Sequence, residues 1–275
     1  MAETFETLLA RPGLLVLPGA YDALSARIAT RAGARAVYMT GFGVVGASFG
    51  VPDIGLIGPE QMIERVAAIA AAIAPLPLVA DGDNGHGDAA RLTEAYERAG
   101  AQCIQIEDQM SPKRCGHMDG KEVVALEEAA AKIRAAATAR ASKAFKIMAR
   151  TDARATHGLD EALRRGEAFL DAGADVLFVE APQSEAELRK IGESFRGTPL
   201  LANLVEDGKT PWASRAALDN FGFKLALYPI GALLAAAERL ETAYRALLAP
   251  DYAGAMPRAS FAHFNEIVGL PGPAR

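Results

Sequence analysis

Short apolar runs typical of strands alternate with longer amphipathic runs along almost the whole chain, and this alternation restricts the fold most. Three predicted helices end in the same Ala-Gly-Ala sequence, centred on Gly33, Gly100 and Gly173, and an apolar run follows each. Glycine at that place supplies the left-handed residue that ends a helix. Each interval between these glycines holds two strand–helix units. Repeated units of this kind predict right-handed crossovers and a parallel sheet.

The number of units distinguishes a closed barrel from an open sheet. The predicted strands are Leu14–Leu17, Ala36–Thr40, Leu76–Ala80, Cys103–Ile106, Phe145–Ala149, Val176–Val179, Pro199–Leu204 and Lys224–Leu227. Eight strands favour a (β/α)8 barrel over a doubly wound open sheet, which also alternates. No linker divides the chain, so we expect a barrel catalytic domain over residues 1–250. A helical segment and tail follow over residues 251–275, with Phe261, Phe264 and Ile267 at helical spacing.

Composition restricts the partners and the compartment. The 275 residues carry a net charge of −5, without runs of Lys and Arg, which argues against nucleic acid and anionic membranes. The longest apolar candidate for a membrane span, Val66–Pro77, is too short and contains Pro75. Two cysteines and an N-terminus without a basic, then apolar, leader predict a cytoplasmic protein.

Reactive polar residues gather at the carboxyl ends of the predicted strands, where barrel enzymes carry their active sites. They are Asp81–Asp88 after the third strand, Glu107–Gln109 after the fourth, Arg150–Asp152 after the fifth, Glu180 after the sixth and Asn203 after the seventh. Asp81, Asp83 and Glu107 would lie side by side and repel one another. A hard divalent cation relieves that repulsion, so the sequence predicts a Mg2+ site, with Mn2+ as a substitute.

Other metal and cofactor motifs fit less well. The histidines are dispersed and do not have zinc-site spacing, and an EF-hand loop would need glutamate at Leu92. The segment Gly41–Gly46 matches the glycine pattern of dinucleotide-binding sites, which must open a helix. Several glycines and prolines follow between Gly50 and Pro59, so we expect no long helix there. A glycine-rich loop whose amides hold a carboxylate is the expectation that remains.

A second informative loop follows the fourth strand and carries Cys115 between charged residues and glycine. Neighbouring Lys113 and Arg114 lower the pKa of a thiol, which suits an acid/base role or a redox switch. Cys103 lies within a predicted strand, where packing is the better interpretation.

On these motifs the chain resembles the isocitrate lyase/phosphoenolpyruvate mutase superfamily, and the loop Lys113–His117 is similar to the signature loop of its carbon–carbon lyase branch. The other matching segments, in order along the chain, are Tyr38–Gly41, Val51–Gly55, Asp81–Asp83, Ile106–Gln109, Ala149–Asp152 and Phe178–Ala181. They span most of the chain. The resemblance implies a (β/α)8 barrel in a homotetramer whose last helix is swapped between subunits.

The resemblance also implies a set of site residues. Mg2+ is expected directly on Asp81 and through water on Asp53, Asp83 and Glu107. Catalytic roles are implied for Cys115 as the general acid, for Lys113, His117, Arg150 and Glu180, and for Tyr38, which is either the base or a packed barrel tyrosine. Substrate contacts are implied for Thr40, Gly41, Phe42, Asp81, Gly116, Arg150, Asn203 and Pro229.

Departures from the family pattern indicate the substrate. Lyases that act on tricarboxylates usually have Ser-Gly-Gly at the place of Thr40-Gly41-Phe42 and often Arg at the place of Met118. The loop is more similar to that of 2-alkylmalate lyases. We therefore expect a Mg2+-dependent enzyme that cleaves a 2-hydroxy di- or tricarboxylate, of the 2-alkylmalate or 2-methylisocitrate type, to a 2-oxo acid and a carboxylate.

Three alternatives remain open at this point. An oxaloacetate hydrolase would have Ser in place of Pro229, and phosphonopyruvate mutases have Asn in place of Cys115. A carboxyphosphonoenolpyruvate-type mutase has a similar loop. The non-enzymatic alternative is a barrel retained as a binding or scaffold protein.

Overall fold

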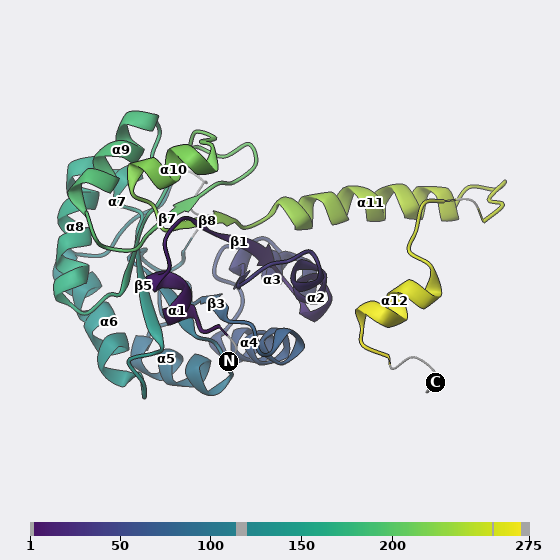
Figure 1. Ribbon diagram of the computed structural model, residues 1–275, viewed down its shortest axis with the longest axis horizontal. Helices are drawn as coiled ribbons and strands as arrows, with labels where there is room; N and C mark the ends of the chain where they lie inside the picture. Colours follow the sequence, from purple (N-terminus) through teal and green to yellow (C-terminus); the bar gives the residue numbers. More distant parts are fainter. Residues whose placement is uncertain (1–2, 114–119, 255, 271–275) are drawn as a thin grey trace.

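The computed structural model describes residues 3–113, 120–254 and 256–270. Within that part of the chain, eight parallel strands pair in sequence order and close into a barrel, because β8 also pairs with β1 (Figure 1). The strands are β1 (Leu15–Ala20), β2 (Val37–Met39), β3 (Leu78–Asp81), β4 (Cys103–Glu107), β5 (Lys146–Thr151), β6 (Val176–Val179), β7 (Leu200–Asn203) and β8 (Leu225–Tyr228). The predicted (β/α)8 barrel is confirmed.

Helices accompany the strands in the described residues, and most of them surround the barrel on its outer side (Figure 1). They are α1 (Phe5–Ala10), α2 (Ala23–Arg31), α3 (Gly41–Phe49), α4 (Pro59–Ile73), α5 (Ala89–Arg98), α6 (Leu126–Ala139), α7 (Ala153–His157), α8 (Leu159–Asp171), α9 (Glu185–Ser194), α10 (Arg215–Phe221), α11 (Gly231–Leu247) and α12 (Phe261–Ile267). The helices that precede Gly33, Gly100 and Gly173 end as expected, since these glycines have φ values of +97°, +98° and +104°.

Side chains alternate between the two faces of each strand, which produces one core inside the barrel and another between the barrel and the helices. In β4, Cys103 points into the barrel, whereas Ile104 and Ile106 pack outward against the helices. The strands are buried on both faces, as a parallel sheet covered by helices requires. The short helix α1, which the sequence pattern did not predict, adds Phe5 and Leu8 to the inner core.

The segment Gly41–Gly46 is a helix and not the loop that we expected. Helix α3 begins after Thr40, whose hydroxyl accepts a hydrogen bond from the backbone N–H of Gly43, and it ends at Gly50. Glycine disfavours a helix by about 1 kcal/mol per residue, but α3 buries Val44 and Val45 in compensation. Packing therefore overrides the local preference, and the glycine pattern lies in a closed barrel and not in the open βαβ sheet to which the dinucleotide fingerprint belongs.

The C-terminal helices leave the barrel surface. Helix α11 projects away from the barrel and α12 turns back toward α2 (Figure 1). Helix α11 buries none of its residues and exposes Leu240 and Tyr244. The division at residue 250 and the swapping of this segment between subunits stay predictions.

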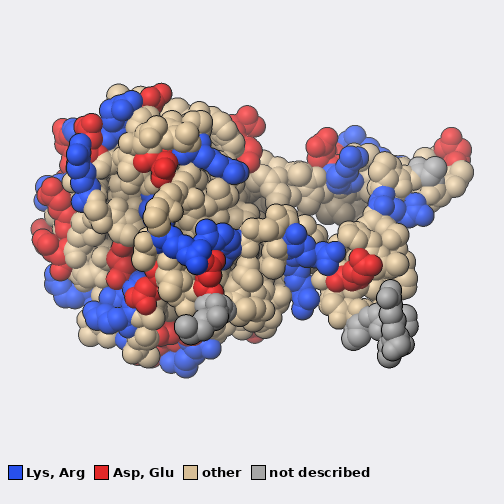
Figure 2. All heavy atoms as spheres, viewed as in Figure 1, with Lys and Arg blue, Asp and Glu red and all other residues tan. Residues whose placement is uncertain are grey.

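Charged side chains of both signs are interspersed over the face of the barrel seen in Figure 2. Among the helices of the described residues, none combines the length and the apolar character needed to cross a lipid bilayer.

Candidate active site

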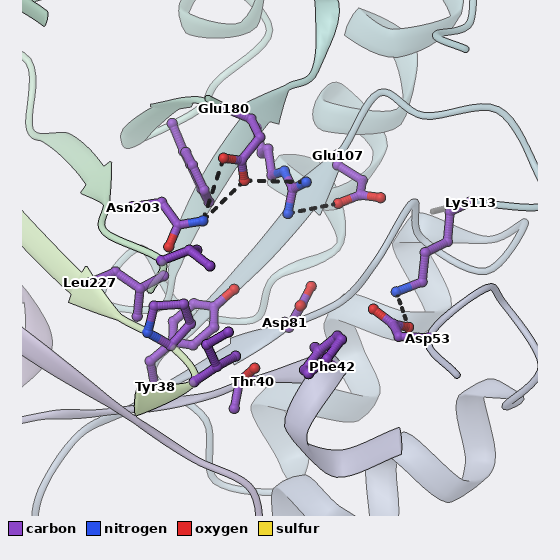
Figure 3. A pocket seen from close by; sticks show the side chains of 15 residues that line it. Tyr38, Thr40, Phe42, Asp53, Asp81, Glu107, Lys113, Glu180, Asn203 and Leu227 are labelled. Atoms are coloured by element: carbon purple, nitrogen blue, oxygen red, sulfur yellow. Dashed lines mark hydrogen bonds and ion pairs between the residues drawn. The ribbon is translucent and has the colours of Figure 1, made fainter. Parts of the chain in front are cut away.

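A pocket opens at the carboxyl ends of the strands and is lined by side chains from β2 to β8 and the segments that follow them (Figure 3). Its empty volume is about 560 Å³ when the open solvent at its mouth is included. The lining residues are Tyr38, Thr40, Phe42, Asp53, Asp81, Glu107, Lys113, Arg150, Phe178, Glu180, Asn203, Val205, Leu227, Pro229 and Ile230.

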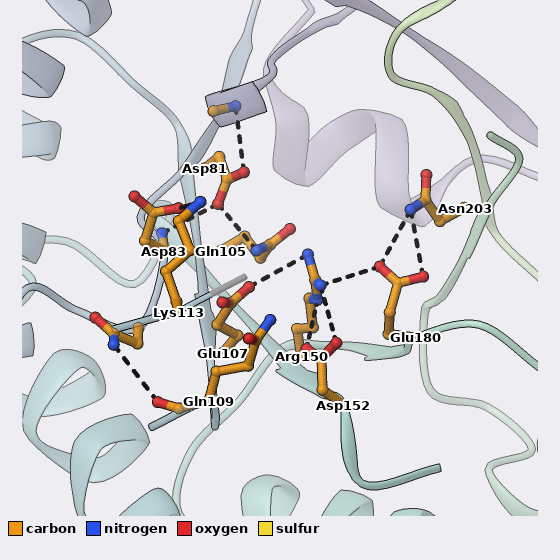
Figure 4. A network of polar contacts seen from close by, with 12 residues as sticks. Asp81, Asp83, Gln105, Glu107, Gln109, Lys113, Arg150, Asp152, Glu180 and Asn203 are labelled. Atoms are coloured by element: carbon orange, nitrogen blue, oxygen red, sulfur yellow. Dashed lines mark hydrogen bonds and ion pairs between the residues drawn. The ribbon is translucent and has the colours of Figure 1, made fainter. Parts of the chain in front are cut away.

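The carboxylate of Asp81 is held at the end of β3 by three donors. Its Oδ1 accepts from the N–H of Asp83 at 3.0 Å and from Gln105 Nε2 at 3.0 Å, and its Oδ2 accepts from the N–H of Gly41 at 3.2 Å (Figure 4). Burial and the nearby charge of Asp83 raise the pKa of Asp81 to about 6. Such a carboxyl gains from a cation beside it.

Lys113 lies between the carboxylates of Asp53 and Asp83, on the same side of the pocket as Asp81. Its Nζ donates to Asp53 and lies 2.6 Å from Asp83 Oδ1, and all three side chains are buried. Burial opposes the charged forms, but Lys113 and His86 outweigh it at Asp83 and hold the pKa of that carboxyl well below its usual value. The carboxylates in turn hold the pKa of Lys113 above its usual value. The ammonium group therefore stays charged in this part of the pocket.

Arg150 joins the acidic side of the pocket to the opposite wall. Its guanidinium forms a bidentate pair with Asp152 at 2.9 and 3.1 Å, and contacts Glu107 at 3.2 Å and Glu180 at 3.3 Å (Figure 4). The guanidinium also lies over the ring of Phe178, 5.2 Å from its centroid. With its ring support and three acidic partners, Arg150 has a fixed orientation.

The opposite wall carries Glu180 and Asn203. Asn203 Nδ2 donates to both carboxylate oxygens of Glu180, at 3.1 and 3.4 Å, and Glu180 also accepts from the N–H of Ala181. Pro229 lies on the same wall after β8.

The acidic side chains fit a hard cation by their chemistry. Glu107 is buried, and its Oε1 has no hydrogen-bond partner among the described residues. Burial raises the pKa of Glu107 well above its usual value, although Arg150 opposes the shift. Oxygen-only donors of this kind suit Mg2+, which keeps several water ligands.

No three His, Cys, Asp or Glu side chains in the described residues are close enough to enclose a metal ion. Asp81, Asp53 and Glu107 nevertheless line one pocket. Which of these carboxylates would bind the ion directly and which through water stays a prediction.

The N-terminus of α3 faces the pocket beside Asp81. A Cβ on Gly41 would lie 2.8 Å from Asp81 Oδ2, and a Cβ on Gly43 would lie 2.7 Å from Thr40 Cγ2. Both glycines are therefore required by close packing. Helix N-termini favour anions, so Thr40, Gly41 and Phe42 remain candidates to bind a substrate carboxylate.

The loop that carries the predicted acid begins and ends at a short antiparallel pairing of Gln109 with Val123, which we call its neck. The backbone of Met110 bonds to that of Glu122, and Val124 bonds to Asp108, both at 2.9 Å. Beyond the neck, Lys121 reaches Asp152 at 2.6 Å, and both side chains are buried. Asp152 thus connects the base of the loop to Arg150.

The predicted site residues converge on this pocket to a large extent. Among those that the structure describes, all line the pocket except two: Gly41, which contacts Asp81, and Asp83, which contacts Lys113. Three others, Cys115, Gly116 and His117, lie outside the described residues.

Sequence reasoning missed Gln105, and it assigned no role to Asp152 and Phe178 although both lie in the motifs that it singled out. The alternation of Cys103, Gln105 and Glu107 with two isoleucines in β4 is a signal that places Gln105 inside the barrel. Tyr38 donates a hydrogen bond of 2.5 Å to Gln105 Oε1, and burial raises the pKa of Tyr38 well above its usual value.

Comparison with known proteins agrees with this geometry. The phosphoenolpyruvate phosphomutase family model matches residues 5–248. The chain belongs to the phosphoenolpyruvate mutase/isocitrate lyase superfamily. Among its relatives, the 2,3-dimethylmalate lyase of Eubacterium barkeri is 43% identical over 98% of this chain and 94% of its own. The 2-methylisocitrate lyase of Bacillus subtilis is 41% identical over 88% and 79%. An enzyme of the lyase type, as predicted, is confirmed for this superfamily member.

Solved structures of the superfamily superpose closely. A crystal structure of 2,3-dimethylmalate lyase gives a TM-score of 0.92 at 36% identity, covering 96% of this chain and 90% of that one. Oxaloacetate acetylhydrolase bound to 3,3-difluorooxalacetate gives 0.93 at 33% identity, covering 98% and 93%. Phosphonopyruvate hydrolase in complex with oxalate and Mg2+ gives 0.78 at 31% identity, covering 93% and 90%.

Proposed function

We propose that the protein is a Mg2+-dependent carbon–carbon lyase that cleaves a 2-alkylmalate to a 2-oxo acid and a carboxylate. The observation that carries the proposal is the composition of the pocket: buried carboxylates on one wall, Glu180 with Asn203 on the other, and the guanidinium of Arg150 between them. A substrate with a metal-binding hydroxy acid at one end and a second carboxylate at the other is complementary to these two walls. The similarity to 2,3-dimethylmalate lyase supports the same substrate class.

Phe42 supports a dicarboxylate over a tricarboxylate. Its side chain lines the pocket where tricarboxylate lyases usually have glycine, which leaves less room for a third carboxylate group. A 2-methylisocitrate-type substrate is the alternative within the same chemistry.

Asp81 would hold Mg2+ directly, and Asp53, Asp83 and Glu107 would hold its water ligands. Bound Mg2+ supplies Lewis acidity, which lowers the pKa of the substrate hydroxyl. Arg150 and the N-terminus of α3 orient the carboxylate next to the bond that breaks.

Cleavage of the C2–C3 bond leaves a 2-oxo acid and an enolate-like carboxylate, which must gain a proton on carbon. Cys115 is the proposed donor of that proton, from the loop whose neck lies at Gln109 and Val123. Lys113 reaches the pocket from the same loop and adds positive charge beside the developing negative charge.

Oxaloacetate hydrolysis is the second candidate, favoured by the close superposition with oxaloacetate acetylhydrolase. Pro229 argues against it, because that side chain lines the pocket and offers no hydroxyl. A homotetramer is also proposed, since α11 buries none of its own residues and presents an apolar face.

A substrate panel tests the proposal. Purified enzyme with Mg2+ is given 2,3-dimethylmalate, 2-methylisocitrate and oxaloacetate in parallel, and the products are identified by mass spectrometry. The proposal expects pyruvate and propionate from 2,3-dimethylmalate at the highest kcat/KM. Phe42→Gly is the matched variant and should shift the preference toward 2-methylisocitrate. Oxalate and acetate from oxaloacetate as the preferred reaction would replace the lyase with the hydrolase.

A further inference from the structure

Gln105 contacts two residues of the pocket without lining the pocket itself. It points into the barrel from β4, it is fully buried, and it stands behind Tyr38 and Asp81. Its Nε2 lies 3.0 Å from Asp81 Oδ1, and its Oε1 lies 2.5 Å from the hydroxyl of Tyr38. Figure 4 shows its bond to Asp81 among the other contacts of that carboxylate.

The direction of these hydrogen bonds follows from the chemistry of the groups. An ionised carboxylate only accepts, so the amide nitrogen of Gln105 must face Asp81. The amide oxygen then faces Tyr38, and because an amide oxygen only accepts, the phenol must donate to it. The hydrogen of Tyr38 is thereby turned toward Gln105, and its oxygen lone pairs are left for the pocket that Tyr38 lines.

We propose that Gln105 is a positioning residue that fixes Tyr38 as a hydrogen-bond acceptor for the hydroxyl of a 2-hydroxy acid. Figure 3 shows the Tyr38 hydroxyl pointing into the pocket on the side of Asp81. This inference rests on the proposed function for the class of ligand. It also assigns Tyr38 a role other than that of the base. A phenol that gained the substrate proton would have to pass its own proton to an amide oxygen, which is a very weak base.

Binding of two probes that differ by one hydroxyl tests the inference without turnover. Affinities for malate and succinate are measured by isothermal titration calorimetry with Mg2+ present, for the wild type, Gln105→Met, Tyr38→Phe and the double variant. Loss of one neutral hydrogen bond should weaken malate binding about two- to tenfold and leave succinate binding unchanged. The double variant should lose no more than the larger of the two single effects, since both changes break the same connection.

A matched control is available at the other end of the same strand. Gln102 precedes β4, and its Oε1 accepts a hydrogen bond of 2.8 Å from the N–H of Phe5. Gln102→Met should lower the melting temperature but keep the preference for malate over succinate. If Gln105→Met does not fold, Tyr38→Phe alone still tests the inference, because it removes the other half of the same hydrogen bond.

The outcomes separate this inference from the lyase assignment. Additive losses in the double variant, equal losses for both probes, or a wild type without preference for malate would overturn the role of Gln105 and leave the lyase intact. Selective loss of malate binding in an enzyme that cleaves none of the panel substrates would uphold the role of Gln105 and remove the lyase.

Discussion

Glu107 and Arg150 face each other in register on the neighbouring strands β4 and β5, and their side chains form a buried ion pair of 3.2 Å. Arg150 also pairs with Asp152 and Glu180, so one guanidinium connects residues from the ends of three strands. Breaking a buried pair is costly, because the remaining charge is left uncompensated. The arrangement of Glu107, Asp152 and Glu180 around the pocket thus depends on the shape of this one side chain.

Arg150→Lys should lower kcat/KM roughly ten- to hundredfold, because an ammonium group cannot make the bidentate pair with Asp152 and reach Glu107 as well. Steady-state kinetics on the preferred panel substrate measures the effect. Arg189→Lys is the control: that guanidinium stacks on Phe221 at 4.5 Å, outside the pocket, and its replacement should leave turnover unchanged. Equal activity of the two variants would contradict the role given to Arg150.

Replacement of two glycines of α3 by alanine should have opposite effects, a loss of activity at Gly41 and a gain in stability at Gly46. Gly41→Ala places a Cβ 2.8 Å from Asp81 Oδ2, which must displace that carboxylate and should lower activity at least tenfold. Gly46→Ala meets no atom within 4 Å and should stabilise the helix by about 0.4–1 kcal/mol. Thermal unfolding and kinetics on both variants check this contrast. An active Gly41→Ala variant would show that Asp81 does not need its present position.

Removal of the metal should abolish turnover, and so should Asp81→Asn, because the neutral amide is a poor direct ligand for Mg2+. Activity after EDTA treatment and after re-addition of Mg2+ or Mn2+ is the measurement. Asp160→Asn is the matched control, since that carboxylate is exposed and pairs with Lys190 away from the pocket. Full activity in excess EDTA would contradict the proposed requirement for Mg2+.

Serine variants of the two cysteines should have different effects, one on the turnover rate and the other on the stability of the protein. Cys115→Ser should lower turnover by about 10²–10⁴-fold, because the serine hydroxyl is a much weaker acid than a thiol. Cys103 is fully buried in the barrel interior, so Cys103→Ser should mainly lower the melting temperature. A Cys115→Ser enzyme with the wild-type rate would exclude this residue as the proton donor.

The barrel could be predicted because its determinants are local: apolar strands, helix-ending glycines and polar residues directly after the strands. The helix α3 could not be predicted in this way, because its first residue, Gly41, is required by a contact with Asp81, which lies 40 residues away in sequence. The contacts of Arg150 are equally non-local, since they depend on strand register. Gln105 was overlooked although its pattern was present, because one polar residue in a strand is usually a structural feature.

The most direct test of the lyase assignment is the cleavage of 2,3-dimethylmalate in D2O by the Mg2+-loaded enzyme. One C–C bond breaks, the hydroxyl carbon becomes the ketone of pyruvate, and the other fragment gains one hydrogen on carbon. The account predicts pyruvate and propionate in equal amounts, with one deuterium at C2 of propionate, and a rate that falls sharply in Cys115→Ser. Absence of cleavage, or propionate without that deuterium, would contradict the central claim.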